Sequence, residues 1–229
     1  MFTISLTVFS IRVDDLFSYI GNLKMKIFVS GFSAVGKSTF VNRIAYELGY
    51  QKFDEIIRTR RKTDSQVSQE NFYNAYLAFH KNPDLVDFVC DRTIVDCAVW
   101  NDIPIKKVQD DLGDSYSKPD LVIIPELPTV TWLYDHHHLF LDDPVRAQAY
   151  TDRLGLSKDK VDWTSTVEIK HFIQLVHNTF KRDELKMMQY YRVLDWPVHV
   201  ASPNYFSWHD TAIGYVLGTL DVKGADSPK

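Results

Sequence analysis

The amino-acid sequence predicts an α/β fold, in which a parallel β-sheet carries helices on both faces. Short apolar segments with β-branched residues alternate along the chain with longer segments of helical periodicity, and strands separated by helices of this length form parallel sheets. The 229 residues suffice for one sizeable domain and are short for two. Because ligands bind such sheets at the carboxyl ends of the strands, the residues that follow each strand are the first candidates for chemistry.

The individual elements follow in order from the N-terminal side. The first strand is the apolar run Lys26–Ser30, which Gly31 ends, and the first helix is Thr39–Leu48, which Gly49 ends. The apolar residues of that helix recur on one face. The other predicted elements are a helix over Ser65–His80, strands over Leu85–Cys90 and Leu121–Ile124, a helix over Thr166–Arg182, weak strands over Arg192–Leu194 and Val198–Val200, and a closing helix over Trp208–Leu220.

We expect residues 25–223 to form a single domain, because the pattern typical of such a domain begins at Met25. Residues 1–24 are interpreted as an N-terminal extension of unknown role. No basic region precedes their apolar residues and no small-residue cleavage site follows, which argues against a signal peptide. Residues 224–229 are expected to be a disordered tail. No apolar run reaches the roughly 18 residues of a transmembrane helix, so no membrane partner is expected.

Composition and charge narrow the class of function. Apolar residues make up 45% of the chain and charged residues 24%, the balance of an ordinary globular protein. The formal net charge of −4 argues against a generic duplex-binding protein, although a local basic cleft, and with it a nucleic-acid partner, stays open. Cys90 and Cys97 lie in apolar context and are too few for a disulfide framework. We therefore expect buried thiols in a reducing, cytoplasmic compartment.

The segment Gly31–Ser38 is a complete G-x-x-x-x-G-K-[ST] motif between the first predicted strand and the first predicted helix. Its glycines let the backbone curl so that several N–H groups point at phosphate oxygens, and the helix N-terminus adds its positive dipole end. We expect Lys37 to reach the β- and γ-phosphates of ATP and the Ser38 hydroxyl to ligate Mg²⁺. The residues expected to bind the nucleoside triphosphate are Gly31, Ser33, Ala34, Val35, Gly36, Lys37, Ser38 and Thr39.

An acidic residue and an arginine follow the predicted strand Leu85–Cys90. Asp91 would lie across from Ser38, where its carboxylate can hold Mg²⁺ through water or accept a proton from the attacking hydroxyl. Arg92 beside it offers a fork for a phosphate or a carboxylate. The alternative interpretation is a surface Asp-Arg pair that caps the next helix.

A second charged cluster comprises Glu55 and Arg58, with the basic run Arg60–Lys62 behind them. Glu55 and Arg58 are spaced to share one face of a helical turn. Glu55 is a candidate for the base that removes a proton from an acceptor hydroxyl, with Arg58 beside the transferring phosphoryl group. A solvated helix end explains the pair equally well, and it is the favoured interpretation for Arg60–Lys62.

With these residues, the chain resembles P-loop nucleoside and nucleotide kinases. It is similar to the thymidylate-kinase and deoxynucleoside-kinase group, and closest to the AAA-type ATPases that include the ribosylnicotinamide kinase domain. Besides the phosphate loop, the resemblance is carried by Glu55-Ile-Ile-Arg58, Asp91-Arg92-Thr93, Pro119-Asp120-Leu121 and, loosely, Asp142-Asp143-Pro144-Val145-Arg146. It implies a P-loop NTPase fold with a helical lid at about residues 135–165, and Mg²⁺- and ATP-dependent phosphorylation of a nucleoside, a nucleotide or a related sugar.

The resemblance also implies roles for residues outside the strand ends. Arg146, in a charged segment that continues with Arg153, would be a lid arginine that neutralises the moving phosphoryl group and helps to exclude water, with a solvated helix surface as the competing explanation. Tyr76 is assigned to the substrate as an aromatic residue that could stack on a base, although core packing is favoured for most of the aromatics nearby. The triplet His136–His138 lacks the spacing of a structural metal site.

Three functions remain open from the sequence. The leading hypothesis is a kinase of a small nucleoside or nucleotide. The second keeps the chemistry but changes the acceptor to a polynucleotide end or a hydroxyl on a modified DNA base, which predicts a broad basic groove. The third is a nucleotide-dependent ATPase switch. Against a GTPase switch, no Asn-Lys-x-Asp motif occurs, and Asp110–Gly113, which fits Asp-x-x-Gly, does not follow an apolar strand. The sequence also leaves open whether the protein forms a homodimer.

Overall fold

A computed structural model describes residues 24–32, 35–55, 69–142, 144–156, 162–201 and 208–225. These residues form a five-stranded sheet with the strand order β2-β3-β1-β4-β5, in which all neighbouring strands are parallel. The strands are β1 (Lys26–Val29), β2 (Gln51–Phe53), β3 (Phe88–Asp91), β4 (Leu121–Pro125) and β5 (Val198–Ala201). The parallel sheet confirms the α/β class that the sequence predicts.

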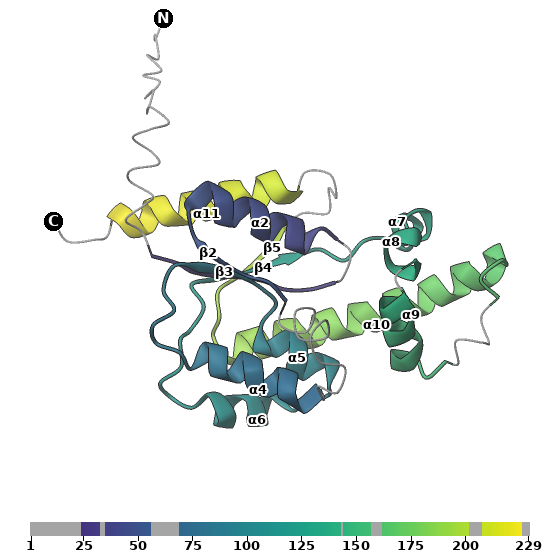
Figure 1. Ribbon diagram of the computed structural model, residues 1–229, viewed down its shortest axis with the longest axis horizontal. Coiled ribbons are helices and arrows are strands. Elements are labelled where there is room, and N and C mark those ends of the chain that lie inside the picture. The colour runs from purple at the N-terminus through teal and green to yellow at the C-terminus, as the bar shows by residue number, and fades with distance from the viewer. Residues whose placement is uncertain are drawn as a thin grey trace, which may run out of the picture.

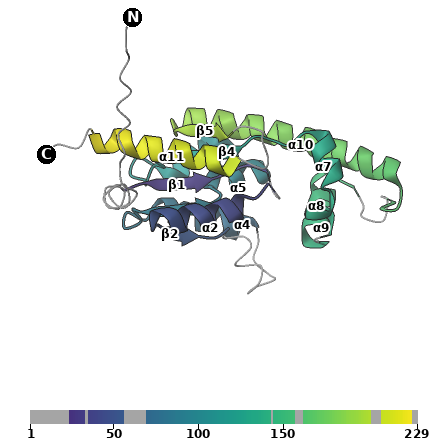
Figure 2. The ribbon, with the colours of Figure 1, turned by 90° about the horizontal axis from the view of Figure 1, so that it is seen from above.

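Helices cover both faces of the sheet (Figure 1). One face carries α2 (Lys37–Leu48) and α11 (Trp208–Ala225). The opposite face carries α4 (Gln69–His80), α5 (Ile94–Trp100), α6 (Ile105–Leu112) and the C-terminal part of α10 (Thr166–Val193). The helices α7 (Val130–Asp135), α8 (His138–Leu141) and α9 (Pro144–Arg153) lie to one side of the sheet beside the N-terminal part of α10, as Figure 2 also shows. We call this group, α7 to α9 with residues 166–180 of α10, the lateral helices.

The strand β1 contributes side chains to the core on both faces of the sheet, because successive side chains of a strand point to opposite faces. Ile27 and Val29 pack in a buried cluster with α2 and α11, whereas Phe28 packs in the cluster formed by α4, α5, α6 and α10. A third cluster joins the lateral helices to Phe32 and Val35, which belong to the loop after β1. The loop that carries the phosphate-binding motif is therefore held by apolar contacts on the side of the lateral helices.

The segment Arg192–Leu194 is not a strand, so this prediction is wrong. It is the end of α10, whose last residue is Val193, and the N–H of Leu194 still donates to Tyr190 O at 2.9 Å. The helix is longer than the predicted Thr166–Arg182 because its apolar positions continue at helical spacing and pack against the sheet.

The short edge strand β2 was not among the predicted elements. Gln51 and Lys52 are exposed and polar, so they show no apolar alternation. Pairing with β3 creates this strand, with Gln51 opposite Phe88 and the Gln51 N–H donating to Asp87 O at 3.0 Å. Its position follows from the tertiary fold rather than from local sequence.

The element boundaries also differ at several ends. β3 begins at Phe88 rather than at Leu85, and α11 runs to Ala225, two residues into the expected tail. Cys90 and Cys97 are buried free thiols, as expected. Among the described residues, none of the helices combines the length and the apolar character that a membrane span requires.

Candidate active site

The loop between β1 and α2 lies at the carboxyl edge of the sheet. Gly31 and Gly36 both have positive φ, 99° and 83°, a region that glycine adopts without strain. A Cβ at Gly31 would lie 3.1 Å from Ile124 Cγ2, so the backbone there passes too close to β4 for a side chain. Gly36 is the N-cap of α2 and brings no side chain to the helix end. The first N–H groups of α2 can therefore serve an anion.

A parallel sheet whose first strand leads through a G-x-x-x-x-G-K-[ST] loop into a helix decides the fold. The chain has the P-loop NTPase fold. In that fold the loop N–H groups and the helix N-terminus form the phosphate-binding cradle. The residues at the ends of the neighbouring strands β1 and β3, which are in register with Val29 opposite Asp91, face the same edge.

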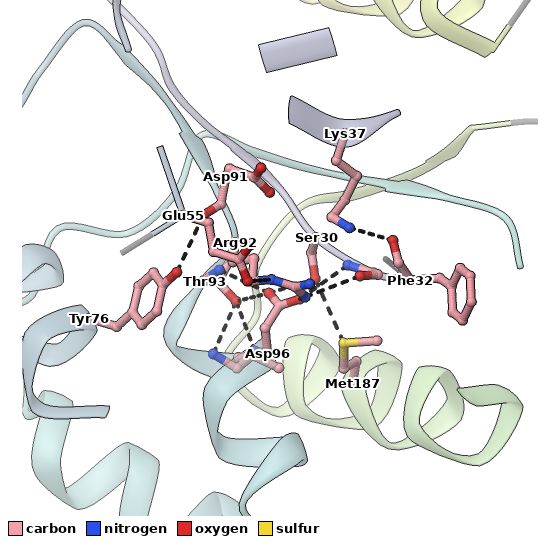
Figure 3. Close-up of polar contacts among 12 residues, drawn as sticks. Ser30, Phe32, Lys37, Glu55, Tyr76, Asp91, Arg92, Thr93, Asp96 and Met187 are labelled. Atoms are coloured by element: carbon pink, nitrogen blue, oxygen red, sulfur yellow. Dashed lines mark hydrogen bonds and ion pairs between the residues drawn. The ribbon is translucent and has the colours of Figure 1, made fainter. Parts of the chain in front are cut away.

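Lys37 lies inside the site rather than on its surface. It is buried, and its Nζ donates to Phe32 O within the loop (Figure 3). The pKa of Lys37 is lowered to about 8, chiefly by burial and also by the positive charge of Arg92, although the carboxylates Asp91 and Glu55 act in the opposite direction. A lysine that loses its hydration on folding gains more from a phosphate than an exposed lysine would.

Ser38 and Asp91 form the pair that the sequence assigned to Mg²⁺. The Ser38 hydroxyl donates to Asp91 Oδ2 at 2.6 Å, and Asp91 is buried. Asp91 Oδ1 is also buried and has no hydrogen-bond partner among the described residues. An unpaired carboxylate oxygen beside a hydroxyl oxygen fits a hard cation such as Mg²⁺, which takes few protein ligands and completes its shell with water and phosphate. In the described part of the chain, no group of three or more His, Cys, Asp or Glu residues could hold a metal alone.

Arg92 has an unusual backbone that turns its side chain into the site. Its φ is 80°, a region that residues with a side chain seldom adopt, and its N–H donates to Val29 O at 2.8 Å. The side chain is largely buried, and Nη1 donates to Gly31 O at 3.3 Å. The cross-strand bond and the contact with the loop hold the strained residue at the end of β3.

Two carboxylates hold the guanidinium of Arg92 (Figure 3). Nε lies 2.5 Å from Glu55 Oε1, and Nη1 lies 3.3 Å from Asp96 Oδ1. Burial alone would lower the pKa of Arg92, but the charges of Glu55, Asp96 and Asp91 raise it well above its ordinary value. The guanidinium therefore stays charged and fixes the position of Glu55 beside the phosphate loop.

Asp96 is the central acceptor of the site, and sequence reasoning gave it no role. Its carboxylate accepts from Ser30 Oγ at 2.8 Å, from the Gly31 N–H at 3.1 Å and from the Thr93 N–H at 2.9 Å, in addition to Arg92. Thr93 and Asp96 form the capping box that starts α5, and their spacing is a signal the sequence does contain. The contacts with Ser30 and Gly31, which tie the loop to the end of β3, have no local signal.

Tyr191 of α10 adds hydrogen bonds to this network. Its hydroxyl donates to Ser30 Oγ at 2.7 Å and lies 3.0 Å from Thr93 Oγ1. Met187 Sδ lies 3.7 Å from the same Ser30 oxygen. The C-terminal part of α10 therefore fixes the end of β1, a role that the sequence did not predict for this helix.

The structure brings together most of the predicted catalytic residues. Lys37, Ser38, Glu55, Asp91 and Arg92 gather with Asp96 at the ends of β1 and β3, and we call these residues the strand-end cluster. Thr39, on the first turn of α2, is exposed. Ser33, Ala34 and Arg58 lie outside the described residues. Arg146 lies in α9, and its side chain is likewise outside what the structure describes.

Tyr76 and Arg153 are both turned toward the interior, and for Tyr76 this agrees with the core packing that the sequence favoured for most of its aromatic neighbours. Tyr76 is 0% exposed and its hydroxyl donates to Asp91 O at 3.4 Å, so here it presents no surface to a ligand. Arg153, at the end of α9, is turned inward: Nη2 lies 3.1 Å from Asp183 Oδ1 and Nη1 donates to Trp100 O at 2.6 Å. It anchors α9 to the rest of the molecule.

Comparisons with known proteins add two structural likenesses. No protein-family model and no curated protein matches the chain. The deoxyadenosine kinase of M. mycoides with bound dATP is similar over 84% of this chain and 99% of that chain, with 14% sequence identity and a TM-score of 0.44. The same kinase with the products dCMP and a flexible dCDP is similar over 85% of this chain and 99% of that chain, with 15% identity and a TM-score of 0.41. The two structures are of one deoxyadenosine kinase, and likenesses of this size leave the activity to be argued from the chain's own residues.

Proposed function

We propose that the protein is an ATP- and Mg²⁺-dependent phosphotransferase that phosphorylates a nucleoside or a nucleoside monophosphate. The observation that carries the proposal is the position of Glu55, 2.5 Å from Arg92 and in the same cluster as Lys37 and the Ser38–Asp91 pair. Nucleotide binding alone requires the loop, the lysine and the Mg²⁺ ligands. A partly buried carboxylate held by Arg92 beside them supplies what transfer to an acceptor hydroxyl needs in addition.

In this proposal the loop N–H groups and Lys37 bind the phosphates of ATP. Ser38 Oγ and the unpaired Asp91 Oδ1 would hold Mg²⁺, which would neutralise charge on the phosphates when bound. Phosphoryl transfer asks little covalent chemistry of the protein, so positioning and charge neutralisation supply most of the rate.

Glu55 and Arg92 act on the acceptor side. When the acceptor is a nucleoside, Glu55 accepts the proton of its attacking hydroxyl, and Arg92 keeps that carboxylate in place with its Nε. The remaining charge of Arg92 lies beside the strand end, where it stabilises negative charge on the phosphoryl group in transit. Asp96 supports both roles because it binds Arg92 and the start of the loop at the same time.

Acceptor dependence tests the proposal. The purified chain is incubated with Mg²⁺ and ATP, first alone and then with a panel of nucleosides and deoxynucleoside monophosphates, and ADP and the phosphorylated product are measured. ADP that forms only with a panel member, together with its phosphorylated product, supports the proposal. Steady hydrolysis without an acceptor contradicts it and favours a nucleotide-dependent switch. Transfer of the γ-phosphoryl group only to a DNA end or a modified DNA base contradicts it in favour of a polynucleotide kinase.

A further inference from the structure

The first turn of α11 contacts the phosphate loop, although the two segments are 173 residues apart. Trp208 Nε1 donates to Val35 O at 3.0 Å, and this contact is buried. His209 Nε2 lies 3.2 Å from Gly36 O. Because a carbonyl oxygen only accepts, Nε2 carries the hydrogen in this contact. Two consecutive carbonyl groups of the loop are thus bound by two consecutive side chains of α11, which lies beside α2 on one face of the sheet (Figure 1, Figure 2).

The geometry of the peptide bond gives these contacts a consequence for the phosphate side of the loop. In a planar trans peptide, the C=O of one residue and the N–H of the next point in opposite directions. The carbonyl of Val35 belongs to the same peptide group as the N–H of Gly36. The carbonyl of Gly36 likewise belongs to the same peptide group as the N–H of Lys37. Donors that hold the two carbonyls on the α11 side therefore direct the two N–H groups to the opposite side, as an anion-binding loop requires.

The two contacts differ in how strongly they fix the carbonyl groups that they bind. Gly36 O also accepts the first helical bond of α2, from the Phe40 N–H at 2.9 Å, so His209 is its second donor. Trp208 is the donor that the structure gives for Val35 O. Loss of the Trp208 donor would leave a buried carbonyl unpaired and free to rotate, so we expect Trp208 to have the larger effect.

The surroundings of both rings fix their orientation. The centroid of Phe40 lies 4.8 Å from that of Trp208 and 5.4 Å from that of His209. A Cβ at Gly36 would lie 3.2 Å from His209 Nε2, which shows how closely the ring approaches the loop. Burial lowers the pKa of His209, so the ring is neutral at neutral pH.

We propose that Trp208 and His209 are positioning residues for ATP, which orient the loop N–H groups by binding the carbonyls of Val35 and Gly36. The inference rests on the proposed phosphotransferase function, because it concerns the same loop. It predicts that the indole N–H of Trp208 affects the affinity for ATP and leaves the KM of the acceptor unchanged, since the contacts described for Trp208 and His209 are with the loop and with Phe40.

A matched pair of tryptophans isolates this effect. Trp208→Phe removes the N–H and keeps an aromatic ring against Phe40. Trp196→Phe removes a comparable indole donor, the Nε1–H that bonds to Tyr116 OH at 2.8 Å in a partly buried contact of the cluster on the opposite face of the sheet. Both variants lose one indole hydrogen bond, so a merely structural role would lower Tm in both without a selective effect on ATP binding.

The measurements are the Kd of ATP by calorimetry, KM for ATP, KM for the acceptor, kcat and Tm. We expect Trp208→Phe to raise the Kd and KM of ATP by about 5- to 10-fold, the effect of one net hydrogen bond, with an unchanged KM for the acceptor. Trp196→Phe is expected to keep wild-type values for ATP at a similar loss of Tm. Equal ATP affinity in the two variants would overturn the inference and leave the proposed function intact. A wild-type protein that does not bind ATP would overturn both.

The histidine provides a second test that does not depend on the folding of Trp208→Phe. His209→Leu removes the donor to Gly36 O, and His209→Gln retains an N–H at a similar reach. We expect His209→Leu to weaken ATP binding by a smaller factor than Trp208→Phe and His209→Gln to restore most of it. Equal affinities of His209→Leu and the wild type would contradict the role of His209. A loss that His209→Gln does not restore would show that ring packing, rather than the hydrogen bond, matters.

Discussion

The strand-end cluster and the lateral helices both carry buried charges, but the charges are arranged for different purposes. In the strand-end cluster, Lys37 bonds only to a loop carbonyl among its described contacts, and Asp91 keeps one oxygen unpaired. At the end of the lateral helices, Arg153 Nη2 of α9 lies 3.1 and 3.2 Å from the two oxygens of Asp183, which follows them on α10, and Nη1 donates to Trp100 O. The first arrangement leaves capacity for a charged ligand, whereas the second uses its charges to hold α9 in place. Substitutions in the two regions should therefore have opposite profiles of activity and stability.

The largest expected effect is on Lys37. Lys37→Met keeps the unbranched stem and removes the charge, so the phosphates lose their buried cation. We expect kcat/KM to fall by about 10³-fold, the upper end for one preorganised donor, with little change in Tm because the buried charge itself opposes folding. Steady-state kinetics and thermal unfolding check this. Activity within a few-fold of the wild type would refute the role of the loop lysine.

A substitution of Glu55 should affect the chemical step without affecting nucleotide binding. Glu55→Gln keeps the shape and an acceptor oxygen toward Arg92 but removes the base. We expect kcat to fall by about 10²-fold, with the Kd of Mg-ATP nearly unchanged, because general-base catalysis contributes at the transition state. Single-turnover kinetics and ATP binding measure the two separately. Unchanged kcat would assign the proton to another group, and Asp91 is the alternative.

Asp91 should show the complementary profile. Asp91→Asn keeps the hydrogen bond with Ser38 but removes the negative charge of the carboxylate, whose other oxygen is unpaired among the described residues. We expect the Mg²⁺ concentration for half-maximal activity to rise by about 10-fold, the order of one charge-assisted contact. A Mg²⁺ titration at saturating ATP measures it. A Mg²⁺ dependence equal to that of the wild type would mean that Asp91 does not serve the cation.

The sequence could place Lys37 and Asp91 at one edge of the sheet because each signal is local, whereas their roles remain predictions. Asp91 follows an apolar run and Lys37 sits in a complete motif, so the parallel sheet alone brings them to one edge. Asp96, Tyr191 and Trp208 were not assigned to the site, because their partners lie 65, 161 and 173 residues away and depend on how α5, α10 and α11 dock against the loop after β1. The same limit explains the interpretation of Arg153 as part of a charged lid segment. Its charge is visible in the sequence, whereas its partner Asp183 becomes visible only in the fold.

The smallest effect on activity is expected at Arg153. Among its described ion pairs, Arg153→Met leaves the buried Asp183 with only Arg182, an exposed residue whose Nη2 lies 3.6 Å from Asp183 Oδ1, and breaking the buried pair costs up to about 3 kcal/mol. We expect a lower Tm, with the KM for ATP unchanged below the unfolding transition, because Arg153 bonds to α5 and α10 and does not reach the strand-end cluster. Thermal unfolding and steady-state kinetics at low temperature measure the two effects. A rise in KM for ATP without loss of Tm would reverse the contrast between the two regions.

The pH dependence of this loss identifies Asp183 as its source. Burial raises the pKa of Asp183 above the ordinary 3.8, and Arg153 opposes that rise. Without Arg153 the pKa rises further, so the folded state binds the proton more tightly than the unfolded state does. Stability then falls as pH rises from the ordinary value through the raised one. The Tm difference between Arg153→Met and the wild type should therefore be larger at pH 8 than at pH 4.5. The double substitution with Asp183→Asn should remove this pH dependence and recover part of the stability, because the buried charge is then absent. An equal difference at both pH values would mean that the lost packing of Arg153 over Trp100, rather than the stranded carboxylate, destabilises the variant.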